Sequence, residues 1–278
     1  MTTPHRPFRG RLFRLSGLTV LFVCIVVAAP AFAFASRSTH GIWVPKFQKG
    51  SVSTKCPTGE RVAFGGLVAQ WDPAHDAWVL PTGMRRTATG QWTVYGQSLS
   101  TSRGSRLTSV AYCDSTGPTS VAEKTVSVAS HQVGSAVAKC PIGTVVVAGG
   151  FNTRALPYAE VVKGLERIAD DSWRVTILNI GDAATTITSI GYCGPGPAPT
   201  LQSAQISVAH GHGGTARATC PMGMELVFGG MVETVGWSKS LPHTIPFSFT
   251  AETTTRWAVA ASNGGFVNGT LTSLAYCR

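Results

Sequence analysis

Three copies of the same pair of cysteine motifs dominate this sequence and limit what it can fold into. The first motif is "CPTGERVAFGG" at residues 56–66, which recurs as "CPIGTVVVAGG" at 140–150 and "CPMGMELVFGG" at 220–230. The second is "LTSVAYC" at 107–113, which recurs as "ITSIGYC" at 187–193 and "LTSLAYC" at 271–277. Self-similarity of this kind is the sequence signature of a repeat architecture. The chain is therefore expected to fold as three copies of one unit.

Other residues recur at nearly constant offsets and set the limits of each unit. A glycine lies six residues before each opening cysteine, and an apolar alternation precedes that glycine. A Trp-x-Val triplet precedes each closing cysteine, and its tryptophans, Trp92, Trp173 and Trp257, are predicted to lie in the core. The predicted units are residues 42–113, 126–193 and 206–277. The segments between them, 114–125 and 194–205, are rich in Pro, Gly, Ser and Thr and are predicted to be linkers.

Alternation of apolar and polar residues predicts strands in each unit. Small side chains share the strand faces of the cysteines, as Ala136 and Ala138 do before Cys140, and would let two strands approach closely. Charged residues make up only 13% of the chain, which is unusual for long exposed helices. The predicted fold class is all-β, with three homologous disulfide-stapled units. The units either close around a pseudo-threefold axis, as in a prism, or form three tandem small sandwiches.

Only a few pairings of the six cysteines in these motifs respect the repeat, and two of them are the simplest. Either each unit closes on itself, or neighbouring units are joined and Cys56 pairs with Cys277. The first is favoured because each unit then keeps its own leading strand and is self-contained. The predicted bridges are Cys56–Cys113, Cys140–Cys193 and Cys220–Cys277. Each would close a loop long enough to contribute about 4 kcal/mol in the chain-entropy model.

Residues 1–35 have the order of a secretory signal peptide. Arg6, Arg9, Arg11 and Arg14 precede the uncharged run "LTVLFVCIVVAAPAFAFA", which ends in small residues. Cleavage is predicted after Ala33 or Ala35, because both positions fit the A-x-A rule. The protein is therefore expected to be secreted, with no membrane span after cleavage. The alternative is an uncleaved N-terminal segment that anchors the chain in a membrane.

The charge of the expected mature chain is mildly basic. Without the four leader arginines, 19 Lys and Arg stand against 13 Asp and Glu, a net charge of +6. These residues are scattered and are read as an ordinary solvated surface, although an anionic cell wall would attract them. No motif supports a nucleic-acid partner. No C-x-x-C spacing supports a metal or redox role for the cysteines.

No recognisable catalytic or cofactor motif is present, so no catalytic residue, cofactor or metal is predicted. The Gly-Gly pairs follow a strand but open no helical pattern, which favours a bulge or a close backbone approach over a phosphate loop. The pair His210 and His212 lies in an expected turn without a nearby acidic partner and is read as loop polarity. No G-x-S-x-G, H-E-x-x-H or recurring carboxylate pair occurs.

The segment between the Gly-Gly pair and the tryptophan differs among the units and is the expected location of a binding site. In the first unit it contains "QWDPAHDAW". Aromatic rings beside carboxylates suit sugar recognition, because a ring stacks on a pyranose face while the acid accepts hydroxyl hydrogen bonds. The alternative is that these rings cover the core. The candidate ligand residues are Trp71, Asp72, His75, Asp76, Trp78, Tyr158 and Trp237.

The motif set resembles that of uncharacterised secreted repeat proteins of actinobacteria. Those proteins carry a Cys-Pro-x-Gly block with a Gly-Gly pair and end in a Tyr-Cys strand, as this chain does three times. More distantly, the chain is similar to vitelline-membrane outer-layer proteins, which are threefold β-prisms with a C-P-x-G turn in each unit. The units here are longer and lack that family's Asp-Asp-Thr-Ala segment. The first resemblance implies secretion and the second a prism.

The function expected from these features is a secreted, non-catalytic binding module of the cell envelope or extracellular space. Its expected ligand is carbohydrate, such as a cell-wall or extracellular polysaccharide, bound through the variable loops. One alternative is a purely structural envelope or matrix protein. Another is a hydrolase of wall polymers that uses Asp72, His75 and Asp76. The oligomeric state is left open.

Overall fold

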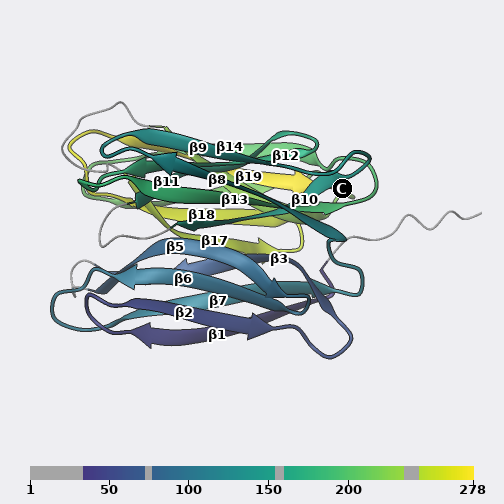
Figure 1. Ribbon diagram of the computed structural model, residues 1–278, viewed down its shortest axis with the longest axis horizontal. Coiled ribbons are helices and arrows are strands. Elements are labelled where there is room, and N and C mark those ends of the chain that lie inside the picture. Colours follow the sequence, from purple (N-terminus) through teal and green to yellow (C-terminus); the bar gives the residue numbers. More distant parts are fainter. Residues whose placement is uncertain (1–33, 73–76, 154–159, 235–243) are drawn as a thin grey trace, which may run out of the picture. The chain divides into compact units, whose positions relative to one another are not determined.

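The computed structural model describes residues 34–72, 77–153, 160–234 and 244–278. These residues form strands, turns and loops and contain no helix. The described residues belong to one compact unit by their contacts, and their strands lie in three sheets (Figure 1). The all-β prediction with three disulfide-stapled units is confirmed.

Each unit contributes the same series of long strands. Unit 1 contains β1 (Ser36–Val44), β2 (Lys49–Lys55), β3 (Arg61–Ala69), β5 (Ala77–Ala88), β6 (Gln91–Ser98) and β7 (Ser105–Asp114), together with the short β4 (Trp71–Asp72). Unit 2 contains β8 (Ser120–Val128), β9 (Val133–Lys139), β10 (Val145–Thr153), β11 (Glu160–Ala169), β12 (Ser172–Asn179) and β13 (Thr185–Gly194). Unit 3 contains β14 (Thr200–Val208), β15 (Gly213–Thr219), β16 (Leu226–Thr234), β17 (Thr244–Thr253), β18 (Arg256–Asn263) and β19 (Gly269–Cys277).

The predicted linkers are wrong in their second halves. The leading strands β8 and β14 begin at Ser120 and Thr200, inside the segments read as linkers. They pair along their full lengths with β13 and β19. Both are edge strands with few buried residues, so Ser and Thr suit their exposed positions. Their composition resembles a linker because only one side of such a strand has to be apolar.

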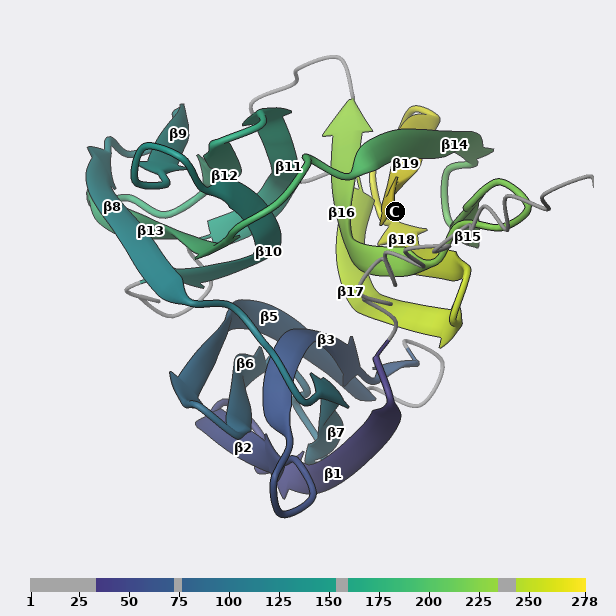
Figure 2. The same cartoon turned by 90° about the vertical axis from the view of Figure 1, so that its right-hand side faces the viewer.

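The three sheets are shared between units. One sheet runs β1-β7-β3-β17-β18-β15, the second β2-β6-β5-β10-β13-β8 and the third β14-β19-β16-β11-β12-β9. Each sheet therefore joins half of one unit to half of another, through the pairs β3 with β17, β10 with β5, and β16 with β11. We call these three pairings the joints. Because they close a ring, the units form one prism-like arrangement and not three separate sandwiches (Figure 2).

The disulfides join the two half-sheets of each unit. The bridges are Cys56–Cys113, Cys140–Cys193 and Cys220–Cys277, with Cα atoms 5.8, 5.7 and 5.7 Å apart. This is the within-unit pairing that the sequence predicted. The serine of each closing motif adds a second link, since Ser189 Oγ donates to the Trp173 carbonyl at 2.9 Å. Ser109 and Ser273 bond to the carbonyls of Trp92 and Trp257 in the same way.

Both members of each Gly-Gly pair leave room for another part of the chain. A Cβ on Gly149 would lie 2.0 Å from the ring of Trp173 in its own unit. A Cβ on Gly150 would lie 2.6 Å from the carbonyl oxygen of Met84, in the neighbouring unit. The same contacts recur for Gly65 and Gly66 and for Gly229 and Gly230. The predicted close backbone approach is confirmed, and the second glycine makes each joint.

A buried tyrosine from each closing motif bonds across a joint. Tyr192 Oη accepts the Arg86 backbone N–H at 2.6 Å. Tyr276 and Tyr112 do the same for Arg167 and Ala251, at 2.8 and 2.6 Å. Burial raises the pKa of Tyr192 and of Tyr276 to about 12 and also raises the pKa of Tyr112. Each hydroxyl therefore stays protonated at neutral pH and holds the adjacent unit.

The joints predict that Gly66→Ala destabilises the protein severely. Its Cβ would lie 2.2 Å from the Phe249 carbonyl oxygen, so β17 would have to move. We expect a loss of about 3 kcal/mol or more in urea unfolding. The control is Gly213→Ala, whose Cβ would make only an ordinary contact at 3.6 Å and should change stability by less than about 0.5 kcal/mol. Equal effects of the two substitutions would contradict the role assigned to the joint.

The tyrosine bonds predict a loss of stability between pH 10 and 12. In that range the unfolded chain releases phenol protons at a pKa of about 10, whereas folded Tyr192 and Tyr276 keep theirs up to a pKa of about 12. The unfolded state then binds fewer protons, so the free energy of unfolding falls as pH rises.

The double variant Tyr192→Phe, Tyr276→Phe should lose about 1–3 kcal/mol per site at pH 7, because two buried N–H groups lose their acceptors. Its further loss between pH 10 and 12 should be smaller than that of the unaltered protein. Denaturant unfolding at a series of pH values measures both effects. Tyr95→Phe is the control, since it removes none of the three joint bonds. A variant curve parallel to the unaltered one across this range would refute the assignment.

Candidate functional site

The strand directions place the described residues that flank the variable segments at the same end of their strands. In unit 1, the end of β1 at Val44 pairs with the start of β7 at Ser105, and the end of β3 at Ala69 pairs with Leu107. The repeat places the other units likewise. We call this end the loop end. The opposite end carries the C-P-x-G turns and the bridges, and we call it the disulfide end; the C-terminus beside Cys277 marks it on the right of Figure 1.

Three aromatic rings meet at the loop end where unit 1 adjoins unit 3. Trp71 in β4 pairs in register with Trp78 in β5, and their ring centroids lie 5.1 Å apart at 82°. The Trp71 ring also stacks on Phe247 of β17, at 5.8 Å and 10°. All three side chains are partly exposed. We call Trp71, Trp78 and Phe247 the aromatic cluster.

Backbone hydrogen bonds fix the hairpin that carries the cluster. The Trp78 N–H donates to Ser100 Oγ at 3.1 Å, and the Trp78 carbonyl accepts the Leu99 N–H at 3.1 Å. The Gln70 carbonyl accepts the Val79 N–H at 3.0 Å. Asp72, which pairs with Ala77, is partly exposed beside the rings. The cluster therefore places flat apolar ring faces and a carboxylate on a hairpin whose backbone is fixed by hydrogen bonds.

The structure brings together three of the candidate ligand residues. Trp71, Asp72 and Trp78 lie on adjacent rungs of one hairpin, as their nearness in sequence suggested. His75, Asp76, Tyr158 and Trp237 lie outside the described residues.

Sequence reasoning missed Phe247, because its neighbour Trp71 lies in another unit and no repeated motif contains it. The alternative prediction, that these rings cover the core, holds in part for Trp71, because one face of its ring packs on Phe247 at the joint of units 1 and 3. Trp92, Trp173 and Trp257 are fully buried, as predicted.

The corresponding position differs chemically at each joint. Thr82, Lys163 and Phe247 occupy equivalent β-bulges in β5, β11 and β17. The Thr82 carbonyl accepts a hydrogen bond from Thr153 Oγ1 at 3.1 Å, and Lys163 forms an ion pair with Glu233. Burial raises the pKa of Glu233, an effect that Lys163 partly offsets. Among the described residues, an aromatic cluster forms at the joint of units 1 and 3.

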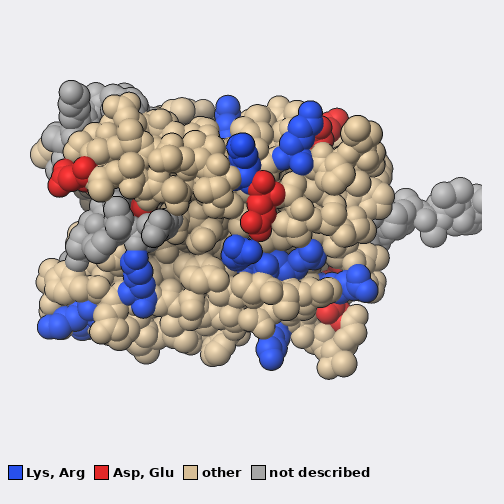
Figure 3. All heavy atoms as spheres, in the orientation of Figure 1, with Lys and Arg blue, Asp and Glu red and all other residues tan. Residues whose placement is uncertain are grey.

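Other candidate chemistry is sparse in the described part of the chain. His210 Nδ1 contacts the Gly265 carbonyl, and its ring stacks on Phe266 at 6.0 Å, which fits loop packing. No group of three or more His, Cys, Asp or Glu side chains that could hold a metal occurs within the described ranges. Most of the surface in Figure 3 is uncharged, and Lys and Arg are spread over it.

No known protein-family model matches this sequence, and no curated protein matches it. The fold shows which class of protein this is: an all-β protein whose three repeats are joined in a ring by shared sheets. Its three disulfides are typical of proteins in extracellular or other oxidising compartments. Within the residues that the structure describes, no helix is long and apolar enough to cross a membrane.

Proposed function

We propose that this protein is a secreted, non-catalytic binding module of the cell envelope or extracellular space, and that its ligand is carbohydrate. The observation that carries the proposal is the aromatic cluster with Asp72 beside it at the loop end. A pyranose ring stacks its apolar face on an aromatic ring, and a carboxylate accepts hydrogen bonds from sugar hydroxyls. Trp78 is the platform, because Trp71 already stacks on Phe247.

Several features support export and an extracellular ligand. The basic and then apolar N-terminus has the order of a signal peptide, and the disulfides suit an oxidising compartment. The resemblance to secreted actinobacterial repeat proteins belongs to the same proposal. A cell-wall or extracellular polysaccharide is the natural ligand class for such a module.

One alternative has an observation in its favour. The ring of joints, locked by three bridges and by tyrosine hydrogen bonds, suits a purely structural envelope protein. A structural protein would need the joints but not the partly exposed ring of Trp78. Substitution of Trp78 therefore distinguishes the binding function from the structural one.

Carbohydrate binding predicts a specific loss in Trp78→Ala. We expect the mature protein to bind a polysaccharide on a glycan array or in a cell-wall pull-down, and Trp78→Ala to weaken binding about tenfold, a change of about 1.4 kcal/mol. The control is Phe266→Ala, which removes an aromatic ring that is 71% exposed and lies in a different loop. Absence of glycan binding would favour the structural alternative. Polysaccharide turnover that disappears in Asp72→Ala would instead indicate a hydrolase.

The packing of Phe34 predicts the cleavage position. Its ring centroid lies 4.8 Å from that of Tyr112 and 5.6 Å from that of Phe64, and the Ala35 N–H donates to the Cys113 carbonyl at 2.7 Å. Cleavage after Ala33 retains these contacts, whereas cleavage after Ala35 removes them. Mass spectrometry of the secreted protein should therefore find Phe34 at the N-terminus. A mature chain that begins at Ser36 would contradict this.

A further inference from the structure

A hollow crosses the joint between units 1 and 2 on the outer face of their shared sheet. On β6, Trp92 and Val94 are fully buried in the core, so the alternate residues Thr93 and Tyr95 face outward. The hollow is open to solvent, is lined from β2, β6, β5 and β10, and has a volume of about 490 Å³. Its size is in the range of small-ligand sites. It is distinct from the aromatic cluster, whose residues do not line it.

The hollow sets one aromatic ring beside one amide. A Cβ on Gly83 would lie 2.8 Å from Asn152 Oδ1 and 3.1 Å from Tyr95 Cδ2. The absence of a side chain at Gly83 therefore lets the ring and the amide lie side by side across the joint. Tyr95 and Asn152 are partly exposed, and Ser51 is exposed on the adjacent strand. This pairing of a flat ring with neutral hydrogen-bonding groups suits a sugar.

The equivalent hollow between units 2 and 3 has different chemistry. Thr176 stands where Tyr95 does, because it pairs with Gly164 as Tyr95 pairs with Gly83. This second hollow has a volume of about 510 Å³ and contains the ion pairs Lys163–Glu233 and Arg174–Glu166. The first hollow has one charged lining residue, Lys49.

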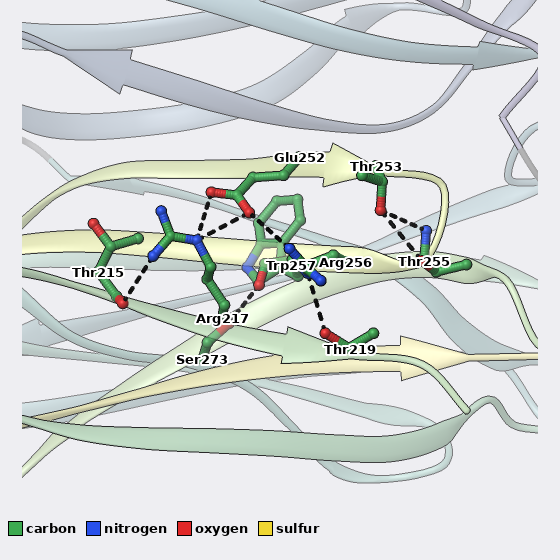
Figure 4. Close-up of polar contacts among 9 residues, drawn as sticks. All are labelled: Thr215, Arg217, Thr219, Glu252, Thr253, Thr255, Arg256, Trp257 and Ser273. Carbon is green, nitrogen blue, oxygen red and sulfur yellow. Dashed lines mark hydrogen bonds and ion pairs between the residues drawn. The ribbon is translucent and has the colours of Figure 1, made fainter. Parts of the chain in front are cut away.

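The third sheet also lacks an aromatic residue at this position. Ala260 replaces Tyr95, since it pairs with Ser248 in the same register. On the same pair of strands, Arg217 holds the Glu252 carboxylate at 2.9 Å, and Arg256 Nε donates to Thr219 Oγ1 at 3.2 Å (Figure 4). The three faces share one backbone, but only the first combines an aromatic ring with an amide among the described residues.

We infer that the hollow between units 1 and 2 binds a neutral oligosaccharide chain, with one sugar ring stacked on Tyr95 and a hydroxyl hydrogen-bonded to Asn152. The inference rests on the proposed carbohydrate function and adds a second site to it. The ligand is neutral because the lining is almost uncharged. It is a chain because the hollow is open to solvent, so that a segment within a polymer can cross it.

The experiment titrates the mature protein with cellohexaose, chitohexaose and the acidic probe hexagalacturonate, followed by NMR. The test variant is Tyr95→Thr, which installs the residue that unit 2 carries at the same place and is therefore expected to fold. Neutral hexasaccharide should perturb amides around Tyr95 and Asn152, and Tyr95→Thr should weaken that binding about tenfold. Thr176→Ala, the equivalent position in unit 2, is the matched control and should bind as the unaltered protein does. Tyr95→Phe should retain binding, because it keeps the ring.

The outcomes separate the second site from the proposed function. If Trp78→Ala abolishes glycan binding while Tyr95→Thr has no effect, the inference is overturned and the proposed function stands. If Tyr95→Thr removes one of two binding events and Trp78→Ala removes the other, the inferred second site and the proposed function are both supported. Binding of hexagalacturonate alone would overturn the neutral ligand. Binding of no oligosaccharide would overturn the inference together with the carbohydrate function.

Discussion

The contact between the second glycine of each Gly-Gly pair and a neighbouring carbonyl oxygen is the constraint on which this structure depends. A Cβ at Gly66, Gly150 or Gly230 would lie 2.2–2.6 Å from that oxygen, closer than any side chain tolerates. Without the glycine, β3, β10 and β16 could not pair with strands of another unit, and the three sheets would not be shared. The tyrosine bonds follow from this approach, because only adjacent backbones bring the Arg86 N–H within reach of Tyr192. The disulfides hold each unit closed, whereas the glycines join the units.

Because all three joints use the same glycine and tyrosine contacts, the residues that differ between units are free to carry function. The bulge position holds Thr82, Lys163 or Phe247, and the outward position on β6, β12 or β18 holds Tyr95, Thr176 or Ala260. None of these substitutions disturbs the buried glycine, tryptophan and tyrosine that form a joint. Each proposed carbohydrate site uses an aromatic residue at one of these two positions. The aromatic cluster contains Phe247, and the hollow between units 1 and 2 contains Tyr95. A repeat built in this way can change its surface one unit at a time.

Local patterns account for what could be predicted and where prediction stopped. Small residues beside Cys140 and the period-two alternation of "ITSIGYC" indicate strands that approach closely enough for a disulfide, and the self-contained units favour a bridge within each unit; the structure has both. The leading strands were placed too late, because Ser120 and Thr200 begin edge strands that need few apolar residues. In the candidate site, Trp71 and Trp78 were found because they are near in sequence. Phe247 was not, since stacking between distant units leaves no sequence pattern.

The amino-acid sequence alone predicts three all-β units, because side-chain alternation acts over a few neighbouring positions. It favours a bridge within each unit, because each unit is then self-contained, but a pairing between neighbouring units also respects the repeat, and the structure decides between them. It does not establish which backbone fills the space above Gly66, Gly150 and Gly230. Tertiary structure decides which backbone lies against these glycines, because a glycine accepts any backbone that comes close. The neighbouring unit takes that place when all three joints form. The hollow beside Tyr95 exists for the same reason: its walls come from two units that are brought together at a joint.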